Sequence, residues 1–126
     1  MDTTTIENCT PFVRVASMKL AIPFYSSIGF KEDWRRQFDS AFPIFLSVSR
    51  DGVRLFLSEH AGDGVLGTRL FLNVSDVDHF HAECVSNGVS VDEAPQDMAF
   101  GVRQMSLRDV DGNVLVFATP LPRRLF

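Results

Sequence analysis

The sequence predicts an α+β fold in which one chain of 126 residues carries two βαβββ modules. Three observations predict it: landmarks that recur 59 residues apart, a stretch of helical periodicity in each half, and an Asp-Gly hairpin signal near the end of each half. The recurring landmarks are Val15, Ser17 and Gly29 in the first half, which return as Val74, Asp76 and Gly88 in the second. Recurrence at a fixed spacing indicates an internal duplication.

Each half is predicted to contain one helix between a cap residue and a glycine. Ser17 and Asp76 are residue types that cap helix N-termini, and Gly29 and Gly88 suit the left-handed residue that ends a helix. Pro23 lies inside the first stretch and lacks a backbone N–H, which predicts a kink or a late helix start. Apolar side chains recur at helical spacing, so each helix should have one apolar face: Met18, Ala21, Phe24, Tyr25 and Ile28, then Val77, Phe80, His81 and Cys84.

Strands are predicted on both sides of each helix. Asp51-Gly52 and Asp111-Gly112 lie between β-rich segments, and Asp-Gly is a strong hairpin signal. The expected strands are 11–15, 30–36, 42–50 and 53–58, followed by 69–74, 90–93, 102–108 and 113–119. Module one would span about 9–60, a linker with three glycines 61–67, module two about 68–119, and a tail 120–126.

The two modules should form a single domain. A four-stranded sheet with one helix has only one face covered, so the modules should pack as a cupped eight-stranded sheet with the helices outside. The hollow of the cup is the natural place for a small-molecule ligand.

Composition and charge exclude several classes of partner. Sixteen acidic against twelve basic residues give a net charge of -4, the wrong sign for a nucleic-acid-binding surface. No stretch approaches the roughly 18 apolar residues that span a membrane, and the N-terminus lacks an export signal. Cys9 and Cys84 are too few for a disulfide framework, so we expect reduced thiols and a cytoplasmic protein.

Strand register predicts which side chains line the cup. If Leu107 and Leu115 oppose each other on the helix side, the cup side of that strand carries Gln104, Ser106 and Arg108. The same logic in the first half places Phe42, Ile44, Leu46 and Val48 with Arg54, Phe56 and Ser58.

Other residues are candidates from loops and strand ends. Trp34, Phe38 and Phe100 would stack on a planar ligand or, alternatively, pack in the core or a dimer interface. His60 is expected at the mouth of the cup, whereas Arg103 would face the ligand or pair with an acid on the helix side. Glu59 and Asp97 would meet a cationic ligand or remain solvated. The predicted ligand-binding residues are Trp34, Phe38, Phe42, Leu46, Phe56, Ser58, His60, Phe100, Arg103 and Gln104.

Several motifs, in order, resemble the vicinal oxygen chelate superfamily, which includes glyoxalase I, extradiol dioxygenases and bleomycin-resistance proteins. They are Phe24-Tyr25 with Ile28-Gly29-Phe30, the run 55–60, Val74-Ser75-Asp76-Val77-Asp78, and Phe100-Gly101-Val102-Arg103 leading to 107–113. The chain is most similar to the short bleomycin-resistance-like members, although Phe100 and Gln104 stand where these usually have Trp and Glu. The resemblance implies a homodimer in which a second chain completes the cup.

Some members of this superfamily hold a metal ion on the floor of the cup. The equivalent positions here are predicted to be Thr10, Phe56, Arg69 and Val116, none of which is an ordinary metal ligand. His79 and His81 are two residues apart on a helix, about 200° around its axis, and would not hold one ion together. We therefore expect no metal, no other cofactor and no catalytic residue.

The sequence therefore favours a metal-free, dimeric protein that binds a small organic molecule, such as a cationic or aromatic antibiotic, and confers resistance by sequestering it. An alternative is a glyoxalase-like lyase, isomerase or dioxygenase with atypical metal ligands, such as His60, or without a cofactor. A third possibility is a regulatory module whose cup is filled by its own side chains.

Overall fold

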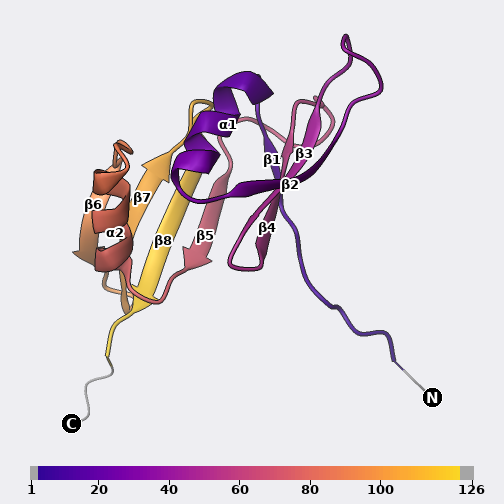
Figure 1. The fold of residues 1–126 in the computed structure, drawn as a ribbon. Coiled ribbons are helices and arrows are strands. Elements are labelled where there is room, and N and C mark those ends of the chain that lie inside the picture. The colour runs from indigo at the N-terminus through magenta and orange to yellow at the C-terminus, as the bar shows by residue number, and fades with distance from the viewer. Residues whose placement is uncertain (1–2, 123–126) are drawn as a thin grey trace.

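One βαβββ unit occurs twice along the chain in the computed structural model, which describes residues 3–122 (Figure 1). Module one consists of β1 (Phe12–Arg14), α1 (Met18–Ser27), β2 (Lys31–Arg36), β3 (Phe45–Arg50) and β4 (Val53–Ser58). Module two consists of β5 (Arg69–Asn73), α2 (Val77–Ser86), β6 (Glu93–Asp97), β7 (Val102–Arg108) and β8 (Val114–Pro120). The predicted α+β architecture is confirmed. Of the predicted tail, residues 123–126 lie outside the described part of the chain.

The eight strands form two four-stranded sheets with orders β1-β4-β3-β2 and β5-β8-β7-β6. In each sheet the first strand pairs parallel with the last, and the other neighbours are antiparallel. Across residues 3–122 no strand pair joins the two sheets. In Figure 1, α1 lies between the sheets and α2 beside β6 and β7 of its own sheet. Neither ten-residue helix in the described chain has the length or the apolar run to cross a membrane.

One hydrophobic core runs through both modules. The helix-facing side chains of the strands meet the apolar faces of both helices in a single cluster: Leu46, Val48, Leu55, Leu57, Met105, Leu107, Leu115 and Phe117 with Met18, Ala21, Tyr25, Val77, Phe80 and Cys84. Both cysteines are free, as predicted, and burial raises the pKa of the Cys84 thiol to about 11. The core therefore holds the two modules together as well as folding each one.

The helix ends follow local chemistry with one exception. Gly29 and Gly88 have φ angles of +88° and +72°, the left-handed conformation predicted for them. Asp76 accepts a hydrogen bond from the backbone N–H of His79 at 3.1 Å, as expected of an N-cap. Ser17 occupies the N-cap position of α1, but its side chain makes no capping bond.

Glu59 caps α1 instead. Its carboxylate accepts hydrogen bonds from the backbone N–H groups of Met18 at 2.6 Å and Ile44 at 2.8 Å. Both roles predicted for Glu59, a ligand contact or a solvated residue, are therefore wrong. The late start predicted from Pro23 is also wrong, because α1 begins at Met18 and runs through this exposed proline.

The hairpins differ in length. Asp51 and Gly52, with φ angles of +51° and +79°, form the two-residue turn predicted between β3 and β4. The loop 109–113 between β7 and β8 is longer. The strand predicted at 90–93 is wrong, because β6 starts at Glu93 and its pairing with β7 contains an irregularity before Gln96.

A buried polar network in this longer loop joins the modules. Tyr25 donates its hydroxyl to the Asp109 carboxylate at 2.7 Å, and Asn113 donates from Nδ2 to the carbonyl of Arg14 at 3.0 Å. Burial, followed by the charge of Asp109, raises the pKa of Tyr25, so the hydroxyl stays a donor. The orientation of α1 relative to the second sheet therefore depends on specific hydrogen bonds as well as on apolar packing.

Candidate functional site

The face of each sheet that points away from the helices carries the candidate site, and strand register decides its composition. In the second sheet, Leu107 pairs with Leu115 and Ser106 with Val116, which confirms that Gln104, Ser106 and Arg108 share the open face. In the first sheet, Ser47 pairs with Phe56 and Leu46 with Leu57. The predicted register of β3 is therefore wrong by one residue.

The short turn explains this shift. With only Asp51 and Gly52 between the strands, Arg50 pairs with Val53, so even-numbered residues of β3 oppose odd-numbered residues of β4. Leu46 consequently lies in the core with 1% of its surface exposed, and it is not part of the ligand-facing surface. The open face instead carries Phe45, Ser47 and Ser49, together with Arg54, Phe56 and Ser58.

Four rings gather on this face, and we call them the aromatic patch: Phe12, Trp34, Phe45 and Phe56. Trp34 stacks on Phe45 with ring centroids 5.8 Å apart, and Phe56 lies 5.1 Å from Phe45 and 5.5 Å from Phe12. Phe12 is 48% exposed. The patch thus presents exposed aromatic surface in a hydrogen-bonded sheet, and it includes the predicted Trp34 and Phe56.

A β-bulge places a carboxylate next to the patch. The pairing of β2 with β3 skips Asp33, and its carboxylate accepts hydrogen bonds from the hydroxyls of Ser47 at 2.9 Å and Ser49 at 2.7 Å. These bonds, the one from Ser49 foremost, lower the pKa of Asp33, so the group is an anion at neutral pH. The Arg36 guanidinium lies over the Trp34 ring at 5.2 Å. The patch therefore combines aromatic stacking surface with charges of both signs.

The other predicted residues of module one surround the patch or are used elsewhere. Ser58 is buried and donates its hydroxyl to Asp63 at 2.7 Å, which makes it a structural residue of the loop after β4. His60 is half-buried in the same loop. Phe38 and Phe42 contact each other in the loop before β3, with ring centroids 6.1 Å apart, and Phe38 is 95% exposed.

The predicted residues of module two lie on or near the second sheet. Phe100 is exposed in the turn between β6 and β7, and Gln104 is half-buried on the open face. Arg103 lies on the opposite face of β7, with Nε 3.1 Å from Asp78 and Nη1 3.1 Å from Asp97. The acid-pairing alternative for Arg103 is confirmed, and Asp97 is solvent-exposed as well as paired with Arg103.

The centre of the open faces does not fit a metal ion. Thr10 precedes β1, and Arg69 pairs with Val114, so the register places neither directly beside Phe56 or Val116. The pairs that Phe56 and Val116 form with the parallel neighbouring strands are Phe12 with Phe56 and Phe71 with Val116. These four hydrocarbon side chains offer no electron pair to a divalent ion. Among residues 3–122, no three His, Cys, Asp or Glu side chains are grouped for metal binding either.

Sequence comparison decides the family. A family model described as "Glyoxalase superfamily protein" matches residues 1–121. The chain belongs to the glyoxalase superfamily. This membership confirms the resemblance drawn from the motifs, although no curated protein matches the sequence.

Solved structures share the fold of this glyoxalase-superfamily chain. A bleomycin resistance determinant encoded on the transposon Tn5 matches with a TM-score of 0.74 and 20% identity, covering 91% of this chain and 98% of the other. A bleomycin-binding protein complexed with bleomycin matches with a TM-score of 0.73 and 20% identity, covering 90% and 98%. TnmS3, an antibiotic binding protein from Streptomyces sp. CB03234, matches with a TM-score of 0.73 and 26% identity, covering 94% and 99%.

Proposed function

We propose that this protein binds a planar aromatic organic molecule on the aromatic patch and protects the cell from an antibiotic by sequestering it unchanged. The observation that carries the proposal is the aromatic patch itself, in which each of the four rings contacts at least two others on an open sheet face with a hydrocarbon centre. Offset or edge-on aromatic contacts add about 0.5–1.5 kcal/mol to the gain from burying apolar area. Such a surface favours a ligand that has a flat aromatic part.

The charged groups beside the patch indicate which polar groups the ligand carries in addition to its aromatic part. Asp33 would accept hydrogen bonds from an ammonium or guanidinium group, and charge-assisted hydrogen bonds are roughly twice as strong as neutral ones. Asp33 lies next to Trp34 on the same bulge, so one molecule would reach both. A cationic aromatic antibiotic, such as a bleomycin-type glycopeptide, has this combination of groups. The similarity to proteins whose structures are described as antibiotic-binding supports this class.

We further propose that the working form is a cytoplasmic homodimer. The open faces point away from the helices of the chain, and a second copy would bring its own second sheet, with Gln104, over the aromatic patch. Two equal pockets would follow from the two-fold symmetry. The free cysteines Cys9 and Cys84 suit a reducing compartment.

Fluorescence of the single tryptophan tests the proposal directly, because Trp34 is part of the aromatic patch. Titration with a metal-free bleomycin-type drug should quench Trp34 with saturation, and the drug recovered afterwards should have an unchanged mass. By calorimetry, Phe56→Ala should weaken binding about tenfold, which corresponds to about 1.4 kcal/mol. Val85→Ala, an exposed change on α2, should leave binding unaltered.

Three results would contradict this function. Turnover of methylglyoxal with glutathione, or chemical change of the bound drug, would place the protein among the enzymes of its superfamily. Stoichiometric metal bound by the purified protein would contradict the absence of metal ligands at the centre of the open faces.

A further inference from the structure

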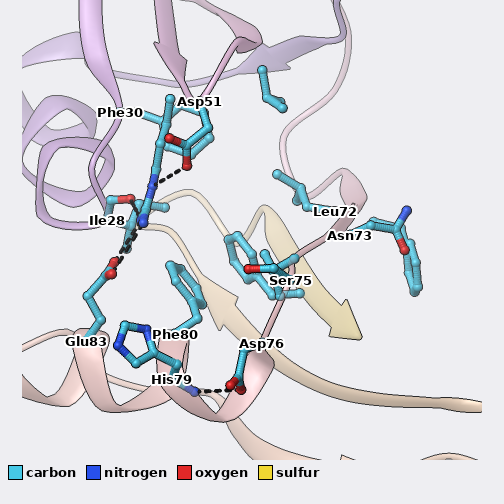
Figure 2. A pocket seen from close by; sticks show the side chains of 15 residues that line it. Ile28, Phe30, Asp51, Leu72, Asn73, Ser75, Asp76, His79, Phe80 and Glu83 are labelled. Carbon is cyan, nitrogen blue, oxygen red and sulfur yellow. Dashed lines mark hydrogen bonds and ion pairs between the residues drawn. The ribbon is translucent and has the colours of Figure 1, made fainter. Parts of the chain in front are cut away.

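A second hollow lies between the two modules, and it shares no lining residue with the aromatic patch. We call it the intermodule cleft, and it has a volume of about 610 Å³. The end of α1, the β3–β4 turn, the end of β5 and one side of α2 form its walls (Figure 2). This volume is within the range of small-molecule sites, which is about 300–1,000 Å³.

The difference between the two hairpins explains why the cleft is open. Each helix meets the hairpin of the other module: Tyr25 of α1 contacts Asp109, and Glu83 of α2 contacts Arg50. The loop 109–113 is long enough to fill the space beside α1 with its buried network. The two-residue turn at Asp51 and Gly52 is shorter, and the corresponding space beside α2 stays empty.

The floor of the cleft is apolar. Phe30, Phe80 and Phe117 form it, each less than 7% exposed, with the rings of Phe80 and Phe117 4.4 Å apart. Val53 and Phe71 stand at the rim and are about half exposed. Because the floor rings are already packed, an apolar body of one or two rings would bury mainly the exposed surface of Val53 and Phe71, which is favourable at roughly 25 cal/mol per Å² of apolar area.

The charged groups around the floor are mainly acidic. Arg50 lies 2.8 Å from Glu83 and 3.3 Å from Asp51, so two carboxylates share its single positive charge. Asp76 adds a third carboxylate, which leaves three negative charges against one positive. Figure 2 shows the Phe80 ring between the side chains of Glu83 and Asp76. The Arg50 guanidinium, 5.4 Å from the centre of this ring, shows that its face already accepts a cation.

We infer that the intermodule cleft is a second binding site, which takes a small organic amine with its apolar body on Phe80 and its ammonium beside Asp76. The excess of carboxylates selects against anions, and the apolar floor selects against small hydrophilic cations. Within one chain, this site shares no lining residue with the four rings of the aromatic patch.

NMR titrations of the backbone amide signals with three small ligands test this inference. Phenethylamine, 2-phenylethanol and phenylacetate share a ring but differ in charge. Titration of the ¹⁵N-labelled protein with phenethylamine should move the amide signals of Val53, Ser75 and Phe80 and leave the Trp34 indole signal in place. The alcohol should bind at least about threefold more weakly, and the anion more weakly still.

Substitutions test whether the Asp76 carboxylate is the group that binds the ammonium. Asp76→Asn keeps an N-cap residue on α2 but removes the carboxylate, and it should weaken phenethylamine binding about two- to fivefold. Glu93→Gln removes an exposed carboxylate on β6, outside the cleft, and should leave binding unchanged. Val53→Trp fills the cleft from an exposed strand end and should abolish the shifts.

Four outcomes would overturn the inference. One is an absence of shifts at these amides with millimolar phenethylamine, and another is equal binding of the three probes. The third is an equal effect of Asp76→Asn and Glu93→Gln, which would reduce the role of Asp76 to general electrostatics. Shifts confined to the aromatic patch would also contradict a separate site.

Discussion

At the residue scale, one carboxylate joins three segments of module one. Glu59 follows β4, and it accepts from the first N–H of α1 and from the backbone of Ile44 in the loop before β3. Both donors would otherwise lack a partner, because the first N–H groups of a helix have none within the helix. Glu59 therefore holds the start of α1 and the approach to the aromatic patch in fixed positions.

Glu59→Ala should lower the free energy of unfolding by about 1–2 kcal/mol, because it leaves both half-buried donors without an acceptor. Ser17→Ala should cost less than about 0.5 kcal/mol, since the Ser17 hydroxyl makes no capping bond. Urea denaturation followed by circular dichroism measures both variants. A larger loss for Ser17→Ala than for Glu59→Ala would show that the serine is the true cap.

At the scale of elements, α1 contains a residue that a helix interior disfavours. Pro23 is the sixth residue of this ten-residue helix, and it is exposed. Its ring removes one backbone hydrogen bond, and an interior proline costs about 3 kcal/mol or more. The buried face of α1, with Met18, Ala21 and Tyr25, is packed well enough for the helix to persist.

Pro23→Ala should raise the free energy of unfolding by about 1–2 kcal/mol, because the restored hydrogen bond outweighs the greater freedom of the unfolded chain. Pro43→Ala is the matched control in an irregular, exposed loop, and it should lower stability by about 0.5 kcal/mol. Thermal unfolding of both variants gives the comparison. A decrease for Pro23→Ala would mean that this proline is an adapted part of α1.

At the scale of the whole molecule, the two modules share one core and one polar network. Tyr25 belongs to module one, and Asp109 and Asn113, its partners in the network, belong to module two. The Asp109 carboxylate is 5% exposed and also accepts from the backbone of Asp111 and Asn113. Breaking a satisfied buried network leaves an unpaired charge, so its loss should affect both modules at once.

Tyr25→Phe should lower the free energy of unfolding by about 1.5–3 kcal/mol. Because the core is continuous, Trp34 fluorescence in module one and hydrogen exchange of β8 amides in module two should report the same decrease. Val110→Ala, an exposed change in the same loop, should stay within about 0.5 kcal/mol of the parent. A drop in only one of the two signals would show that the modules unfold separately.

Much of the fold could be predicted because its signals are local. Helix ends at Gly29 and Gly88, the cap at Asp76 and the turn at Asp51-Gly52 depend on backbone preferences and on bonds spanning a few residues. The duplication extended these local signals to the order of helices and strands along the chain. The site was harder, because the faces of β2 and β3 depend on pairing. The one-residue error in β3 moved Leu46 onto the ligand side and hid Phe45.

The amino-acid order alone therefore determined the two modules, their helices and hairpins, and the family to which the chain belongs. Only the tertiary structure decided that Phe12 and Phe45 join Trp34 and Phe56, that Asp33 bulges beside them, and that a cleft opens between the modules. The physical reason is the distance along the sequence over which the interactions act. Turn and cap energies arise within one segment, whereas an open face or a cleft exists only where segments distant in sequence meet.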